Sequence, residues 1–382
     1  MNKYLLLLIA TTLFFSCGSN EYSVGEIKFN DNTILVCDEA KVKEEREIPL
    51  SRFIDDLQII RLENDDNAFF QFGWIAISPN YFAIRQYDGG PIKLFNKKGE
   101  FINNIGNVGQ GPGEYGSVYD ILIDETNDAV YVTQIVGDEI MVFNLQGEFK
   151  QSIEFKDRLN KPRLFMNADG SLSLTHLCFT DKNSPFTIAT IDIANPDSVR
   201  YLFTENLASS SKNREGHTTG LNNEIWSYRN SKNFPFMYTI TDTLYNYNIS
   251  HNEVEAKFTL SMTKERKGKS FFVFNELPNY FHANIVGGEH RKSILIDKTT
   301  KEAYAIKVVN DFLGNLPTSA RFQDGYYFEI AEPLILKEKI EEHIDSGDCP
   351  SSQIDQLTAL LNSLHENDNN ILLLGSLRTS AN

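Results

Sequence analysis

Residues 92–101 read Ile-Lys-Leu-Phe-Asn-Lys-Lys-Gly-Glu-Phe, and residues 140–149 read Ile-Met-Val-Phe-Asn-Leu-Gln-Gly-Glu-Phe. The two stretches start 48 residues apart and share Ile, Phe, Asn, Gly, Glu and Phe at equivalent places. An apolar run, a glycine turn and a second apolar run are typical of a β-hairpin. Weaker copies begin at Ile188, near Leu244 and near Ser293. A repeat of about 40 to 50 residues built from short strands predicts a β-propeller.

Each hairpin is interpreted as the two outer strands of a blade, so the two inner strands should precede it. Residues 119–124 and 129–133 have the alternation expected of such inner strands. This register predicts an all-β fold, a six-bladed β-propeller. The six inner strands are expected to start near Phe70, Val118, Pro162, Asn222, Asn279 and Pro317.

The two ends of the chain are expected to close the ring, because an open ring would leave a sheet edge unpaired. Residues 57–62 form a strand without a blade of its own, and residues 370–377 return as a strand at the other end. We expect these two strands to complete the sixth blade together. Between them, residues 333–365 have helical spacing of apolar residues. We interpret this segment as a small helical insertion in the last blade, and residues 51–382 as the propeller.

The amino terminus carries a targeting signal. Residues 4–15 are apolar and follow Lys3, but they are too few to span a bilayer as a helix. Residues 13–17, Leu-Phe-Phe-Ser-Cys, are similar to a bacterial lipobox. Residues 1–16 are therefore interpreted as a lipoprotein signal peptide, with Cys17 as the acylated residue that enters the lipid bilayer. The alternative is a plain signal peptide without acylation. Residues 17–50 are expected to form a tether and an N-terminal segment before the propeller.

Composition restricts the classes of partner. The chain has 382 residues, a formal net charge of −16 and 41% hydrophobic residues, which indicates a globular protein and disfavours nucleic acid as a partner. No other apolar run reaches 18 residues, so no transmembrane helix is expected.

Cys37, Cys178 and Cys349 are odd in number and widely spaced, and we interpret them as single thiols rather than as a disulfide framework.

Residues 105–115, Ile-Gly-Asn-Val-Gly-Gln-Gly-Pro-Gly-Glu-Tyr, lie between the first two hairpins. This string resembles the signature linker of the six-bladed β-propeller lipoproteins of Bacteroidetes, which are related to NHL-repeat and TolB-like propellers. The early strand at residues 57–63 and the closing strand at residues 370–372 are similar to the same family. The resemblance implies the propeller fold and a place in the cell envelope, as an outer-membrane lipoprotein on the periplasmic or the surface face. It implies no catalytic residue.

Linkers from an outer strand to the next inner strand usually lie on the side of a propeller where ligands enter, here called the access face. Glu114 and Tyr115 end one such linker, and its glycines serve a turn better than a phosphate site, since no helix follows them. Arg214 and His217 lie in a longer linker. We expect these four residues to be candidates for ligand binding, with Arg214 and His217 over the central channel.

Two functions from different classes remain open. The first is a membrane-anchored binding protein without catalysis or cofactor, whose access face binds a glycan, a peptide or an envelope protein. The alternative is a metal-dependent hydrolase of the lactonase or lyase type, with Ca²⁺ in the channel to polarise a carbonyl group. The oxygen ligands available near inner strands for that metal are Asp120, Asn167, Asn222, Glu224 and Asn284.

Overall fold

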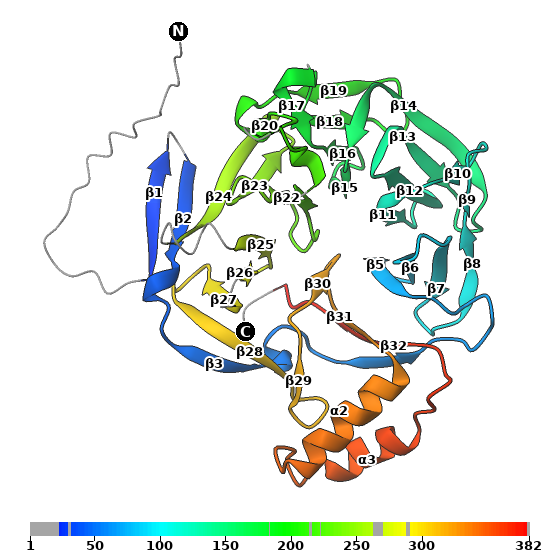
Figure 1. The fold of residues 1–382 in the computed structure, drawn as a ribbon, viewed down its shortest axis with the longest axis vertical. Coiled ribbons are helices and arrows are strands. Elements are labelled where there is room, and N and C mark those ends of the chain that lie inside the picture. Colours follow the sequence, from blue (N-terminus) through cyan, green and yellow to red (C-terminus); the bar gives the residue numbers. More distant parts are fainter. Residues whose placement is uncertain are drawn as a thin grey trace, which may run out of the picture.

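The protein forms a ring of six β-sheets around a central axis (Figure 1). A computed structural model describes residues 23–379, except residues 30–31, 183, 214–215, 222, 263–269 and 288–290. Cys17, Arg214 and Asn222, three of the predicted functional residues, therefore lie outside the described part of the chain. The sheets confirm the predicted all-β, six-bladed propeller.

Blades one to three are antiparallel sheets whose four strands follow one another from the axis outward. Two short parallel pairs, β9 with β10 and β17 with β20, lie in the connections. The strands are β5 (Phe72–Ile77), β6 (Tyr81–Gln86), β7 (Ile92–Asn96), β8 (Phe101–Ile105), β9 (Asn107–Val108), β10 (Glu114–Tyr115), β11 (Val118–Asp124), β12 (Ala129–Gln134), β13 (Val136–Phe143), β14 (Phe149–Asn160), β15 (Arg163–Met166), β16 (Leu172–Thr175), β17 (Cys178–Phe179), β18 (Ile188–Ile191), β19 (Val199–Leu202) and β20 (Ala208–Ser209).

Blades four to six each include strands from the amino-terminal segment. In blade four β2 pairs in parallel with β24, and in blade five β3 pairs in parallel with β28. The strands are β1 (Val24–Phe29), β2 (Asn32–Asp38), β3 (Glu45–Pro49), β4 (Gln58–Arg61), β21 (Ile225–Trp226), β22 (Phe234–Tyr238), β23 (Thr243–Asn248), β24 (Glu253–Ser261), β25 (Phe271–Glu276), β26 (Tyr280–Val286), β27 (Lys292–Asp297), β28 (Ala303–Asn310), β29 (Leu316–Thr318), β30 (Phe322–Gln323), β31 (Tyr326–Ala331) and β32 (Ile371–Ser376).

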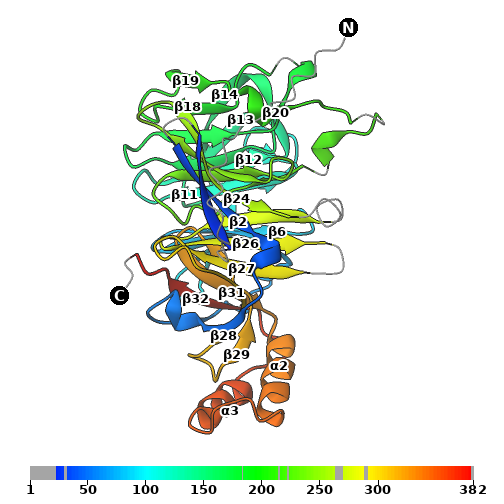
Figure 2. The ribbon, with the colours of Figure 1, turned by 90° about the vertical axis from the view of Figure 1, so that its left-hand side faces the viewer.

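The ring closes as predicted. β4 pairs antiparallel with β32, and their register places Ile60 opposite Leu372. The two strands are more than 300 residues apart in the sequence, yet together they form the outer half of blade six. Helices α2 (Pro333–Asp345) and α3 (Ile354–Asn362) lie between β31 and β32 in the chain and project beyond the rim (Figures 1 and 2). No helix among the described residues is long and apolar enough to cross a membrane.

The glycine of the repeat explains how neighbouring blades pack. Gly99 and Gly147 close the outer hairpins of blades one and two at φ values of +89° and +83°. A Cβ at Gly99 would overlap the carbonyl oxygen of Arg61 in β4, and one at Gly147 would overlap that of Asn104 in β8. Each glycine therefore permits a positive φ and a close approach to the preceding blade.

Two predicted inner strands are misplaced. Blade five begins at Phe271, not near Asn279, which precedes its second strand. Blade six begins at Phe322, while Pro317 lies in β29, which pairs with blade five. The first error has a physical cause, because β25 is buried on both faces for most of its length and lacks the alternation of a half-buried strand.

Candidate functional site

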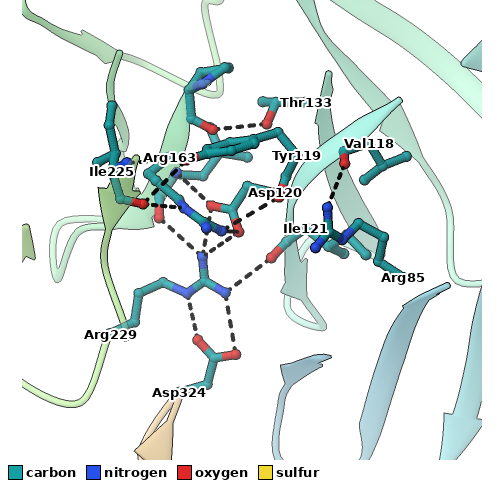
Figure 3. Close-up of polar contacts among 12 residues, drawn as sticks. Arg85, Val118, Tyr119, Asp120, Ile121, Thr133, Arg163, Ile225, Arg229 and Asp324 are labelled. Carbon is teal, nitrogen blue, oxygen red and sulfur yellow. Dashed lines mark hydrogen bonds and ion pairs between the residues drawn. The ribbon is translucent and has the colours of Figure 1, made fainter. Parts of the chain in front are cut away.

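Near the axis of the ring lies a charged cluster in which Asp120 pairs with two arginines (Figure 3). Asp120 lies on β11 and is completely buried. Its carboxylate accepts hydrogen bonds from Arg163 Nη1 at 3.1 Å and from the backbone amide of Leu164 at 2.9 Å. Arg229 Nη1, from the segment after β21, donates to the same carboxylate at 2.9 Å. The cluster joins blades two, three and four.

Further polar contacts extend this cluster around the axis. Arg229 also pairs with Asp324 in the turn after β30, and Asp324 accepts a hydrogen bond from the amide of Ile77 at 2.8 Å. Asn230 donates to Asn275 Oδ1 at 3.0 Å and to the carbonyl of Phe322 at 2.9 Å. The axial contacts thus connect all six blades.

The arginines of the cluster remain charged because their partners outweigh the cost of burial. Burial alone would lower the pKa of Arg229, but Asp120 and Asp324 raise it above its ordinary value. The guanidinium of Arg163 also lies between two rings, 4.5 Å from the ring centroid of Trp74 and 4.4 Å from that of Tyr119. The two positive charges of Arg163 and Arg229 are balanced by the two negative charges of Asp120 and Asp324.

Next to this cluster lies a cavity of about 370 Å³, here called the axial cavity. It opens beside the starts of inner strands β5 and β30, on the access face. Aromatic side chains make up much of its wall. The lining residues are Phe72, Gly73, Trp74, Tyr228, Asn275, His282, Asn284, Ala320, Arg321, Phe322 and Phe328.

Two polar atoms of the wall have no hydrogen-bond partner among the described residues. They are Trp74 Nε1 and His282 Nδ1, both buried. The other imidazole nitrogen of His282 lies 2.7 Å from Ser293 Oγ. Burial lowers the pKa of His282 to about 4, so its ring is neutral at pH 7. A buried polar atom without a partner costs free energy unless water or a ligand satisfies it.

Two further cavities lie elsewhere in the ring. A cavity of about 330 Å³ lies at the opposite ends of the inner strands, near Ile77, Met166 and Asp324. A cavity of about 540 Å³, here called the rim cavity, lies beside the end of β14 and the linker after β20. Its walls include Arg158 and Lys212.

Glu114, Tyr115 and His217, the predicted ligand-binding residues that the structure describes, do not line the axial cavity. Tyr115 is only 1% exposed, and its hydroxyl accepts from the amide of Ile92 at 2.8 Å, so it packs between blades and cannot contact a ligand at the surface. Glu114 folds back onto its own loop and accepts from the amide of Gly111 at 2.8 Å. His217 is exposed in a turn whose neighbours Lys212 and Thr218 line the rim cavity.

The four residues named for Ca²⁺ that the structure describes, Asp120, Asn167, Glu224 and Asn284, do not gather into one cation site. Asp120 is neutralised by two arginines, and Glu224 pairs with Lys161 and accepts from the hydroxyl of Tyr119. Asn167 donates to Ser171 and Ser173 within its own turn. Asn284 lines the axial cavity, separately from the others. Among the described residues, no three His, Cys, Asp or Glu side chains gather where they could hold a metal ion. These donors do not fit Ca²⁺.

Sequence reasoning named one residue of the axial cavity, Asn284, and missed the others. Trp74 was available as one of only two tryptophans in the chain. No pattern in the sequence singles out His282. Arg321 carries no local signal, because its position at the cavity mouth depends on where blade six begins. Cys37, Cys178 and Cys349 are free thiols, as predicted, and the structure shows that all three are buried.

Solved structures support the fold. An exported protein of Bacteroides fragilis matches with 20% identity and a TM-score of 0.61, over 88% of this chain and 98% of that one. A member of the DUF4221 family from Bacteroides vulgatus matches with 10% identity and a TM-score of 0.46, over 85% and 97%. Virginiamycin B lyase from Staphylococcus aureus matches with 14% identity and a TM-score of 0.39, over 65% and 73%. Only the first likeness is strong enough to support the propeller, and it concerns fold alone.

Sequence comparison identifies the family. None of the curated proteins matches the chain. One family model, described as a domain of unknown function (DUF4934), matches residues 32–376. This range runs from β2 to the last residue of β32 and so includes all six blades. The chain belongs to the DUF4934 family.

Proposed function

We propose that this chain is an envelope lipoprotein that binds a glycan in its axial cavity and performs no chemistry on it. The observation that carries the proposal is the aromatic wall of the cavity, which combines Trp74 and Tyr228 with buried polar atoms that have no hydrogen-bond partner in the described part of the chain. A sugar ring has apolar C–H faces and a polar edge. The faces would pack on aromatic rings, and the hydroxyls would bond to the polar atoms between them.

The size of the cavity favours a small ligand. Its volume of about 370 Å³ lies near the lower end of the range for small-molecule sites, about 300–1,000 Å³. One or two sugar rings would fill such a space. A peptide side chain or the tip of an envelope protein would be the competing occupants, and the binding experiment below separates them from sugars.

The anchor is the second part of the proposal. Acylation of Cys17 would hold the propeller at a membrane, because two or more acyl chains bind a bilayer stably where one does not. The lipobox at residues 13–17 supports this. Wild-type chain should incorporate labelled palmitate and sediment with membranes, while Cys17→Ser should do neither. Equal labelling of the two would refute the anchor.

The binding proposal is tested with a panel of oligosaccharides and envelope peptides, measured by calorimetry on a soluble chain starting at Ser19. At least one sugar should bind, and Ala320→Phe should abolish binding, because Ala320 lines the cavity and phenylalanine would fill it. Ser319→Phe is the matched control, since Ser319 is exposed and does not line the cavity. EDTA should leave the affinity unchanged. Binding of peptides alone, or equal effects of the two variants, would refute a glycan site here.

A further inference from the structure

We propose that the ligand of the axial cavity is an acidic sugar whose carboxylate pairs with Arg321. This inference rests on the proposed glycan function and adds its chemical class. Among the residues that the structure describes, Arg321 is the one charged residue of the cavity wall, and no aspartate or glutamate lines that wall. The chain as a whole has a net charge of −16, so the positive charge of the cavity wall is opposite in sign to that of the whole protein.

The two arginines of the charged cluster, Arg163 and Arg229, are ion-paired, and Arg321 differs from them in this respect. Arg163 pairs with Asp120, and Arg229 pairs with both Asp120 and Asp324. Within the described part of the chain, Arg321 has no ion pair with an acidic side chain. The wall also contains His282, whose imidazole is neutral at pH 7 because burial lowers its pKa to about 4. A carboxylate on the ligand could therefore pair with Arg321 without displacing an acidic side chain of the described residues.

The backbone holds Arg321 firmly at the cavity mouth while its side chain reaches solvent. Its carbonyl accepts a hydrogen bond from the amide of Phe328 at 3.1 Å, and its amide donates to the carbonyl of Ser319 at 2.9 Å. The next residue, Phe322, is 1% exposed and lines the same cavity. The side chain of Arg321 is exposed. A ligand can thus reach the guanidinium without any rearrangement of the blade.

The guanidinium selects among anions by shape. Its planar fork of N–H groups matches the two oxygens of a carboxylate, which makes such pairs both strong and directional. A uronic acid offers this carboxylate next to a ring with C–H faces, so one sugar could contact Arg321 and the aromatic wall together. A sulfated sugar has the negative charge but lacks the planar pair of carboxylate oxygens that the guanidinium matches. It is therefore included as a separate arm of the test.

The experiment compares sugars that differ only at C6: oligomers of glucuronate against glucose, and of galacturonate against galactose, together with a sulfated galactose oligomer. Affinities are measured by calorimetry on the soluble chain starting at Ser19. In at least one of these two pairs, the acidic oligomer should bind at least tenfold more tightly than the neutral oligomer. Arg321→Gln should weaken binding of the acid about tenfold and change that of the neutral sugar less than twofold. Arg321→Lys should restore part of the difference.

A charge-matched control separates pairing from general attraction. Arg158→Gln removes one exposed cation that lines the rim cavity and not the axial cavity. It should leave the preference for the acid unchanged. Equal affinity for acid and neutral sugars, a preference for sulfate, or equal losses in the two glutamine variants would overturn the acidic-sugar assignment and leave the glycan proposal standing. Binding of no sugar at all would overturn both.

Discussion

Asp120 shows how a residue chosen correctly for its position can have a different role from the one expected. Its place near the start of an inner strand puts it at the axis, as predicted for a metal ligand. The partners that neutralise it, Arg163 and Arg229, come from two other blades. Arg229 also adopts a φ of +53°, which few non-glycine residues do. Neither feature can be read from the local sequence, because both depend on how the blades are placed around the ring.

Removing the charge of Asp120 should destabilise the whole propeller. Asp120→Asn would leave two buried arginines short of a carboxylate, and breaking a buried pair in this way costs about 3–5 kcal/mol. Urea unfolding followed by circular dichroism measures the loss. Asp197→Asn, at an exposed position, is the control and should change stability by less than about 0.5 kcal/mol. Equal stability of the two variants would show that the cluster does not hold the blades together.

Lys97 should make stability depend on alkaline pH. Burial lowers its pKa from 10.5 to about 8, and its Nζ has no hydrogen-bond partner among the described residues, although it lies 3.9 Å from the ring centroid of Tyr326. The unfolded chain therefore binds more protons at Lys97 between about pH 8 and pH 10.5, and stability should rise with pH in that window.

The variant Lys97→Met isolates this effect from other titrating groups. It should melt a few degrees higher than wild type at pH 7, where wild type carries the buried charge. The difference should shrink as the pH rises from 8 to 10.5, as the lysine of the folded protein becomes neutral. Lys98→Met, at the exposed neighbouring position, should show neither change. A difference that is constant with pH would contradict the lowered pKa of Lys97.

The repeated hairpin is the element that sequence reasoning interpreted most completely. β7 with β8 and β13 with β14 lie where the two copies predicted outer strands. Strands β1 to β3 were not foreseen, because they add to blades four and five outside the repeat and carry no copy of it. Pairing of this kind joins segments more than 200 residues apart, and periodicity along the chain contains no information about it.

Alanine substitutions test the glycine of the hairpin. Gly99→Ala and Gly147→Ala should each destabilise by more than the cost of the left-handed backbone alone, about 1–2 kcal/mol, because their Cβ atoms would overlap a carbonyl of the neighbouring blade. Gly170→Ala supplies the comparison, since Gly170 has a φ of +84° but no atom near its Cβ position. Urea midpoints measure all three. If Gly170→Ala lowers stability as much as Gly99→Ala and Gly147→Ala do, the close contact between blades does not explain why the repeat has glycine at this position.

At the scale of the whole molecule, the ring depends on β4. A chain starting at Leu50 would retain β4 and lose β1 to β3, whereas a chain starting at Asn64 would lose β4 as well and leave β32 with an unpaired edge. We expect the first to unfold cooperatively as a monomer and the second to aggregate or lack a cooperative transition, by size-exclusion chromatography and thermal melting. Similar behaviour of the two chains would show that closure by β4 is dispensable.

The central claim, that the axial cavity is the ligand site, is tested most directly by tryptophan fluorescence. The chain has only Trp74 and Trp226, so Trp226→Phe leaves Trp74, in the cavity wall, as the single reporter. Titration with the sugar that binds in calorimetry should change the emission of Trp74 saturably, with the same dissociation constant, and Ala320→Phe should abolish the change. An unchanged Trp74 emission while calorimetry still reports binding would place the site elsewhere on the molecule and contradict this account.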